Sequence, residues 1–254
     1  MMKIKIAPLF LLILLCSCRT INRNRTELNI PPSVVYFSFD DGPNVKDDTT
    51  ASLLDVLKKN QIKAMFCLLG VNVEQAPDLV KRIYDEGHCI VNHGYSDKWA
   101  IKMNPDEFRN NLIRGGAAIS AVLGHDKYPR LYRPHGGFYT SVQEKIIREE
   151  GYMLIPSNIR VYDAVIDGTK QDKVVKKIIE KVEKHGGGII LLHDARDSYA
   201  RAGAQTATPF QDVFNRSWIP GTVEEIITIL LEKDYILNNS DIFNWLLEAD
   251  YQGN

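Results

Sequence analysis

A short apolar run that ends in two adjacent acids, residues 34–43 (VVYFSFDDGP), constrains the fold more than any other part of this sequence. Its Val, Tyr and Phe residues are β-branched or aromatic, which predicts a buried strand. Gly42 and Pro43 then favour a turn. Two neighbouring carboxylates at the end of a buried strand repel each other, so a metal ion or a basic partner must hold them. A solvated turn with an Asx cap is the alternative, and the polar clusters described below favour the first interpretation.

The chain has 254 residues, which is enough for one large core. Its 31 basic and 32 acidic residues balance each other, so we expect no nucleic-acid partner. Cys67 and Cys89 each lie inside a predicted strand. We expect them to be buried free thiols, with a disulfide as the alternative.

The first eighteen residues have the pattern of a targeting segment. Lys3 and Lys5 precede an apolar run at 6–15, which is too short to span a bilayer comfortably. The following LCSC sequence, residues 15–18, resembles the bacterial lipoprotein cleavage box, with Cys18 as the lipid-bearing residue. We therefore expect an exported protein held by a lipid anchor on the periplasmic or cell-surface side, with an ordinary secretory signal as the alternative. Residues 19–32 are interpreted as a tether and 33–250 as the folded domain.

Short apolar segments alternate with amphipathic ones along the rest of the chain. Strands are predicted within 34–43 and at 62–69, 88–92, 131–132, 152–155, 188–192 and 235–237. Helices are predicted at 49–60, 77–86, 105–123 (with a possible kink at its Gly-Gly pair), 142–150 and 173–184, from a capping box at 222–225, and at 242–247. This alternation predicts parallel βα units. Clusters of polar residues follow five of the predicted strands. In a βα barrel, the positions just after the strands converge on one face. A doubly wound open sheet is the alternative fold.

Asp41, His93 and Asp97 are the predicted ligands of a divalent metal ion. His93 and Asp97 are four residues apart, so one helical turn would place both side chains on the same face. A charge at a helix N-terminus is the alternative interpretation of Asp97.

Acid–base roles are predicted for side chains that follow other strands. Asp40 is interpreted as a general base, Arg133 as its ion-pair partner and His193 as the general acid. An ordinary rim ion pair and a hydrogen-bonded rim histidine are the alternatives. Backbone N–H groups at Gly136 and its neighbour Gly137 can stabilise an oxyanion. His135 is predicted to contact substrate, with a metal contact as the alternative.

Five sequence motifs in this order resemble the polysaccharide deacetylases of carbohydrate esterase family 4, which contain the NodB-homology domain. FSFDDGP at 37–43 is similar to the family's TFDDGP, and GHCIVNHGYSD at 87–97 to its GHEIGNHTYSH. RPHGG at 133–137, NIRVYD at 158–163 and LLHD at 191–194 are similar to the third, fourth and fifth motifs. The resemblance extends from about residue 34 to residue 237.

The resemblance implies a distorted (β/α)7 barrel and metal-dependent removal of N- or O-acetyl groups from sugars. It implies the same roles for Asp40, Arg133 and His193, and metal ligation by Asp41 and His93. We expect zinc, with cobalt, manganese or nickel as alternatives.

Three positions depart from the family's motifs. Asp97 stands where the second motif ends in His, and His135 stands where the third motif has Pro. Arg160 replaces one Asp of the fourth motif, which leaves Asp163 as a predicted substrate contact and puts the pKa of the acid histidine in question. These departures allow reduced activity or an altered substrate.

The resulting hypothesis is an enzyme that removes N-acetyl groups from the N-acetylhexosamines of peptidoglycan or a chitooligosaccharide-like glycan. A catalytically weak glycan-binding module is the first alternative, in which Trp218 of the predicted long loop 195–221 stacks on a sugar ring. An O-acetyl esterase of the xylan type is the second.

Overall fold

The structure, a computed structural model of the chain, describes residues 21–23, 30–124, 128, 130–196 and 212–237. Its strands are β1 (Ile21–Arg23), β2 (Val35–Gly42), β3 (Met65–Leu68), β4 (Cys89–Asn92), β5 (Leu131–Tyr132), β6 (Phe138–Thr140), β7 (Met153–Leu154), β8 (Ile159–Arg160) and β9 (Gly188–His193). Its α-helices are α1 (Thr49–Lys59), α2 (Gly70–Gln75), α3 (Pro77–Asp85), α4 (Pro105–Leu123), α5 (Ser141–Glu149), α6 (Gln171–His185) and α7 (Ile219–Glu232). Short 3₁₀ turns are η1 (Ala100–Lys102), η2 (His135–Gly137), η3 (Asp163–Val165) and η4 (Gly168–Lys170).

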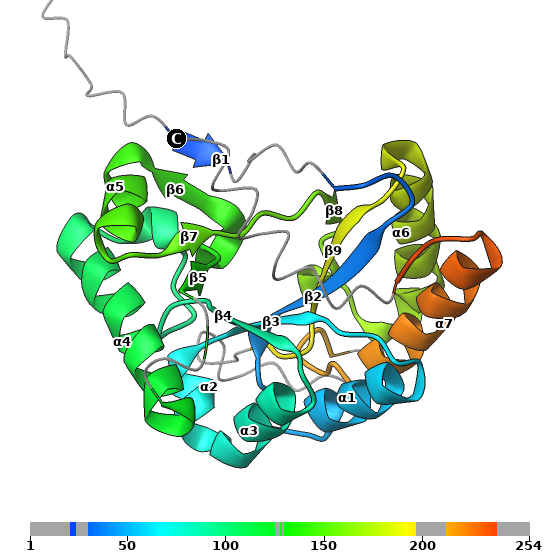
Figure 1. Cartoon of the computed structure of the whole chain (residues 1–254), viewed down its shortest axis with the longest axis horizontal. Helices are drawn as coiled ribbons and strands as arrows, with labels where there is room; N and C mark the ends of the chain where they lie inside the picture. The colour runs from blue at the N-terminus through cyan, green and yellow to red at the C-terminus, as the bar shows by residue number, and fades with distance from the viewer. Residues whose placement is uncertain (1–20, 24–29, 125–127, 129, 197–211, 238–254) are drawn as a thin grey trace, which may run out of the picture.

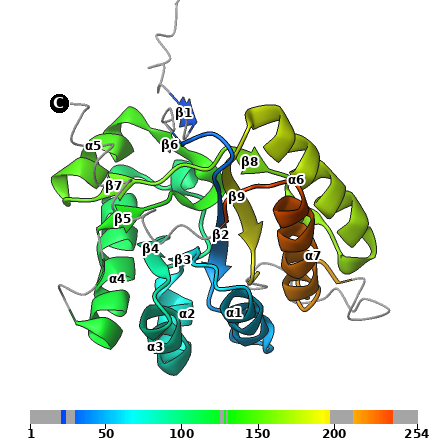
Figure 2. The same cartoon turned by 45° about the vertical axis from the view of Figure 1, so that its right-hand side comes forward.

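Seven strands form one sheet in the order β7-β5-β4-β3-β2-β9-β8, and every neighbouring pair is parallel. The sheet is curled into a half-barrel, and the helices lie in an arc around its outside (Figures 1 and 2). This arrangement confirms the predicted distorted (β/α)7 barrel in preference to a doubly wound open sheet.

Strand β2 lies in the middle of the sheet and is buried on both faces, as expected for a parallel sheet covered by helices. Val35, Phe37 and Phe39 belong to the large core between the sheet and the helices. Tyr36 belongs instead to a smaller core made almost entirely of strand residues, inside the half-barrel. Because side chains alternate along a strand, Ser38 and Asp40 share the inner side with Tyr36.

Helix α4 begins and ends where the sequence predicts. Asn104 caps its first turn by accepting the Glu107 N–H (2.9 Å), while the Glu107 carboxylate accepts the Asn104 N–H (3.1 Å). The Gly115–Gly116 pair does not interrupt the helix. A Cβ at Gly115 would lie 2.6 Å from the carbonyl carbon of Gly94, so this glycine lets the helix approach the loop after β4 closely.

Two predicted elements differ from the structure, and one helix was not predicted. Residues 235–237 make only an isolated bridge between Ile236 and Val34, whereas β8 supplies the seventh strand. Helix α7 begins at Ile219 and not at a capping box at Thr222, whose hydroxyl donates to the Trp218 carbonyl (2.9 Å) within the helix. Helix α2 is six residues long and was not predicted. The helix predicted at 242–247 lies outside the described residues.

Part of the predicted tether is paired with the domain. Strand β1 lies antiparallel to β6, with Ile21 opposite Thr140 and Arg23 opposite Phe138. Cys67 and Cys89 are buried free thiols, as expected. Among the described residues, no helix is both long and apolar enough to cross a bilayer.

Candidate active site

A bulge at the end of β2 turns two consecutive carboxylates toward the same place. Side chains of neighbouring strand residues normally point to opposite faces. Here the pairing with β3 shifts between Asp40 and Gly42, and Asp41 has a left-handed backbone with φ of 73°. The Asn72 amide, on α2, donates to the Asp41 carbonyl (2.9 Å) and holds this turn. As a result, Asp40 Oδ2 and Asp41 Oδ1 lie 3.7 and 3.5 Å from the same atom, His93 Nε2.

The carboxyl ends of the neighbouring strands bring the other predicted residues to this point. His193 is the register partner of Asp40 on the adjacent strand β9. His93 and Arg133 directly follow β4 and β5, and the His93 ring contacts the Arg133 carbonyl oxygen. Residues from four separate parts of the chain therefore meet at one edge of the sheet.

Asp40 forms a buried ion pair with Arg133. The guanidinium Nη1 donates to Asp40 Oδ1 (2.6 Å) and to the Ser38 hydroxyl (2.9 Å). The other guanidinium nitrogens donate to the carbonyls of Ile155 (3.4 Å) and Pro156 (3.2 Å). Burial alone would raise the pKa of Asp40, but Arg133, His93 and His193 together outweigh burial and the pKa is lowered. Asp40 is thus ionised and fixed in direction.

The imidazole of His93 presents a lone pair to Asp41. Its Nδ1 lies 2.7 Å from the Arg133 carbonyl oxygen, which can only accept a hydrogen bond. Nδ1 therefore carries the proton of the neutral ring, and Nε2 is left as an acceptor facing the two carboxylates. This is the form in which histidine binds a metal ion.

His135 is oriented in a similar way by Asp97. Its Nε2 lies 2.6 Å from Asp97 Oδ1 and donates to it, which leaves Nδ1 facing Asp41 Oδ1 at 3.3 Å. Burial alone would lower the pKa of His135, but Asp41 and Asp97 outweigh burial and raise the pKa to about 10. The two carboxylates therefore draw positive charge to this ring, and a metal ion at Nδ1 would take the place of the ring's second proton.

Asp41, His93 and His135 together fit a divalent metal ion. Their ligand atoms lie within 4.8 Å of one another, and all three residues are buried. Ligands on a tetrahedral zinc ion, with bonds of about 2.0–2.1 Å, are about 3.3 Å apart, and the oxygen–nitrogen separations here are 3.3 and 3.5 Å. Among the described residues, neither Asp41 oxygen nor His135 Nδ1 has a hydrogen-bond partner. A cation would satisfy all of these buried atoms.

A second buried network surrounds His193. Its Nδ1 lies 2.9 Å from Asp163 Oδ1, and its backbone N–H donates to Asp163 Oδ2 (2.9 Å). The guanidinium of Arg216 donates to the same Oδ2 (2.6 Å) and to the carbonyls of His193 (3.0 Å) and Asp163 (3.1 Å). Burial alone would lower the pKa of His193, but Asp163, with Asp41 and Asp40, outweighs burial and the pKa is raised. His193 is therefore held in a form that can donate a proton.

Comparison with known proteins places this arrangement in a family. The family profile described as polysaccharide deacetylase matches residues 28–155, which is half of the chain. The chain belongs to the polysaccharide deacetylase family.

Individual relatives agree with that assignment. A peptidoglycan-N-acetylglucosamine deacetylase of Bacillus cereus is 35% identical over 63% of this chain and 55% of its own length. A peptidoglycan-N-acetylmuramic acid deacetylase of Bacillus subtilis is 29% identical over 68% of this chain and 65% of its own. The solved Bc1960 peptidoglycan N-acetylglucosamine deacetylase matches with a TM-score of 0.64 and 29% identity, covering 80% of this chain and 84% of that one. The alignment with the first relative spans little more than half of that protein.

The structure of this member of the polysaccharide deacetylase family brings together five residues that the sequence predicted to converge: Asp40, Asp41, His93, Arg133 and His193. Asp97 is close as well, but its carboxylate contacts His135, and His135 is the third member of the group around the candidate metal position. The assignment of Asp97 as a ligand stays a prediction, and the structure offers His135 in its place.

Two predicted substrate contacts, Asp163 and Trp218, have buried side chains, and their assignment stays a prediction. Asp163 is fully buried between His193 and Arg216. Trp218 is only 3% exposed, and its ring packs under the guanidinium of Arg216, 4.6 Å from the ring centroid. In the structure, both residues contact Arg216 beside His193.

Of the two glycines predicted to stabilise an oxyanion through a backbone N–H, only Gly136 remains a candidate. The Gly137 N–H already donates to the Pro134 carbonyl (2.9 Å), so it is not free for an oxyanion. Gly136 has φ of 78°, and a Cβ there would lie 3.0 Å from the Trp99 ring, so both the backbone and the space require glycine.

Two asparagines that the sequence analysis did not identify hold the loop 93–97. Asn111 Oδ1, on α4, accepts the N–H groups of Tyr95 (3.1 Å) and Ser96 (3.0 Å). Asn92 Oδ1 accepts the Gly94 N–H (2.8 Å), and its amide donates to the Leu112 carbonyl (2.9 Å). The loop that carries His93 and Asp97 is therefore tied to a helix at both ends. The sequence signal that could have identified Asn92 is an asparagine at the end of an apolar strand, where a polar side chain needs hydrogen-bond partners.

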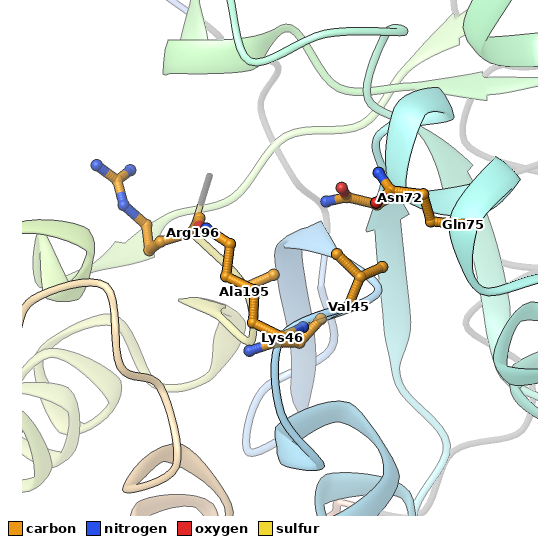
Figure 3. A pocket seen from close by; sticks show the side chains of 7 residues that line it. Val45, Lys46, Asn72, Gln75, Ala195 and Arg196 are labelled. Atoms are coloured by element: carbon orange, nitrogen blue, oxygen red, sulfur yellow. Dashed lines mark hydrogen bonds between the residues drawn. The ribbon is translucent and has the colours of Figure 1, made fainter. Parts of the chain in front are cut away.

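A cavity of about 170 Å³ lies next to this site. Lys46, Ala195 and Arg196 line one side of it, and Asn72 and Gln75 line the other (Figure 3). It adjoins the metal position, because Asn72 binds the Asp41 carbonyl and Arg196 Nη1 lies 3.7 Å from Asp41 Oδ2. The lining of the cavity is part polar and part apolar, and the cavity is a space directly beside these groups.

Proposed function

We propose that this chain is a metal-dependent hydrolase that removes the acetyl group from N-acetylhexosamine residues of peptidoglycan or a related glycan. The relatives bear the names of peptidoglycan deacetylases, and the chain belongs to their family. The observation that carries the proposal is local. A buried, ionised Asp40 and a proton-donating His193 lie side by side on adjacent strands, next to Asp41, His93 and His135, whose ligand atoms lie close together.

Asp40 is the general base in this proposal. Arg133 keeps its carboxylate ionised and leaves Oδ2 free to face the reaction centre, because Oδ1 is held by the guanidinium. Asp40 takes a proton from the attacking water as the oxygen–carbon bond to the acetamide forms. The Gly136 N–H can donate to the carbonyl oxygen as that oxygen gains negative charge.

His193 is the general acid. Its proton passes to the sugar nitrogen as the carbon–nitrogen bond breaks, so that acetate and a free amine leave. Asp163 supports this role from the other side of the ring by stabilising the protonated imidazole. The Asp that is missing at position 160 therefore does not leave His193 without a carboxylate partner.

Asp41, His93 and His135 would hold the metal ion, and we propose zinc because two imidazoles and one carboxylate are borderline ligands. When bound, a divalent ion polarises the amide carbonyl and stabilises the negative charge that develops on it. Cobalt, manganese and nickel are the alternatives.

Release of acetate tests this function. We expect the purified protein to release acetate and expose amines on N-acetylchitooligosaccharides or on peptidoglycan, to lose this activity after chelation, and to regain it with Zn²⁺ or Co²⁺. Acetate and free amines are measured together, since an O-acetyl esterase would release acetate from acetylated xylan without forming amines. A protein that binds these glycans with metal present but forms no amine would contradict the proposal.

The burial of Trp218 weakens the alternative that this chain only binds glycan. It relied on aromatic side chains of the predicted long loop, and Trp218 is buried. The other aromatics of that loop, at positions 199 and 210, lie outside the described residues. The catalytic proposal is therefore the better supported of the two.

We also propose that the chain is exported and anchored through a lipid on Cys18. This rests on the charged start, the apolar run and the LCSC sequence of residues 1–18. Incorporation of labelled palmitate into the wild-type protein, and its absence in a Cys18→Ala variant, is the expected result. Equal labelling of both proteins would exclude this residue as the anchor.

A further inference from the structure

We propose that Asp97 and His135 act as one unit, in which Asp97 orients His135 so that this histidine supplies the third protein ligand of the metal ion. Asp97 is then a positioning residue and not a ligand. This inference concerns the metal site that the proposed function uses, and it can be tested by metal binding alone.

The hydrogen bonding of the two histidines supports this assignment. A metal-binding histidine usually donates its second ring N–H to a carbonyl or a carboxylate. His93 does so to the Arg133 carbonyl (2.7 Å), and His135 does so to Asp97 (2.6 Å). The two free ring nitrogens then face the same atom, Asp41 Oδ1, from 3.5 and 3.3 Å. The sites of both histidines are thus built in the same way.

The position of Asp97 argues against direct ligation. The ring of His135 lies between Asp97 and Asp41, because Asp97 contacts Nε2 while Asp41 faces Nδ1. The side chain of Asp97 is 24% exposed, whereas those of Asp41, His93 and His135 are 1–5% exposed. Asp97 is therefore outside the buried group that surrounds the ion.

The two departures from the family's motifs compensate each other in this arrangement. Asp97 stands where the resembled second motif has a histidine, and His135 stands where the third motif has a proline. An imidazole is lost on the loop after β4 and gained at η2, after the next strand of the sheet. The new acid at position 97 then fixes the ring that replaces the lost one. The candidate ligands in this chain are then two histidines and one aspartate.

Metal binding by single variants tests the unit. Co²⁺ is titrated into metal-free protein, with calorimetry for affinity and stoichiometry and visible absorption for the coordination of the ion. His135→Ala is expected to lose stoichiometric binding. Asp97→Ala is expected to bind one ion 10–100-fold more weakly, the range typical for loss of a carboxylate behind a ligating histidine, with a wild-type Co²⁺ spectrum at saturation. Asp97→Asn keeps an acceptor for the ring N–H and is expected to lose less affinity than Asp97→Ala.

Asp106→Ala is the matched control, because Asp106 is an exposed aspartate of the neighbouring helix α4, outside the candidate metal group. It is expected to bind like the wild type. Far-UV circular dichroism of the metal-free variants confirms that each is folded. Stoichiometric binding by His135→Ala, complete loss or unchanged affinity in Asp97→Ala, or an altered Co²⁺ spectrum in that variant would each overturn the inference. Since no substrate is present, an absence of acetate release would refute the proposed function without affecting this result.

Discussion

An Asp40→Asn variant is expected to release acetate more slowly by a factor of about 10²–10⁴, the contribution typical of a general base. Asparagine keeps an oxygen that can accept from Arg133 but cannot take a proton from water. Because Asp40 lies outside the candidate metal group, the variant is expected to bind Co²⁺ as the wild type does. Initial rates on N-acetylchitooligosaccharide, together with a Co²⁺ titration of the same sample, measure both effects.

Asp48→Asn is the matched control for this variant. Asp48 is an exposed aspartate just before α1, and its side chain makes no capping hydrogen bond to the helix. It is expected to keep full activity. If Asp40→Asn retained its turnover with metal bound, Asp40 would not be the base.

An Arg216→Met variant is expected to lose about 3–5 kcal/mol of unfolding free energy, the range for breaking a buried ion pair by removing one partner. Arg216 is fully buried, and it donates to the Asp163 carboxylate and to three backbone carbonyls, the third being that of Ile166 at 3.2 Å. Methionine fills much of the space but leaves Asp163 with a charge that only His193 balances. Urea unfolding of metal-free protein at neutral pH measures the change.

Arg148→Met provides the comparison for an exposed arginine. Arg148 pairs with Glu144 on the surface of α5, and its side chain is 70% exposed. Such a pair contributes at most about 1 kcal/mol. A double variant, Arg216→Met with Asp163→Asn, is expected to lose less than the sum of its two single variants, because it removes both members of the buried pair. A loss below that of Arg148→Met would show that the Arg216 network does not stabilise the fold.

The sequence was most informative where chemistry and strand pattern coincide. Each of the five residues predicted to converge lies at or just after the end of a short apolar run, and parallel strands bring such positions to one edge. Asp40 and His193 are therefore register partners, as a barrel requires. The same alternation predicted parallel βα units, and the resemblance to the deacetylases implied that they form a distorted barrel.

Sequence patterns could not decide questions that depend on contacts between distant segments. Asp97 and His135 are both possible ligands by residue type, and only the direction of the His135 ring distinguishes them. An aromatic residue in a long loop can stack on a sugar or pack in the core, and for Trp218 the neighbouring Arg216 decides it. The sequence also did not indicate that Arg216, in the predicted loop 195–221, pairs with the buried Asp163.

Short or ambiguous local signals explain the errors in secondary structure. Strand β8 has two residues and helix α2 has six, which is too little for a periodic pattern to appear. The T-x-x-E sequence at 222–225 matches a capping box, but the helix has already begun at Ile219 with proline in its first turn. The match arose inside a helix, where the threonine bonds to the preceding turn.

The left-handed backbone of Asp41 limits how the ion preference of this protein can be redesigned. Among residues with a side chain, aspartate and asparagine adopt this conformation most readily. Exchanging Asp41 for glutamate or cysteine would therefore strain the bulge as well as change the reach or the type of the donor atom. The described backbone at positions 93 and 135 has no such restriction. Substitutions intended to change the metal preference are therefore better made at these two histidines than at Asp41.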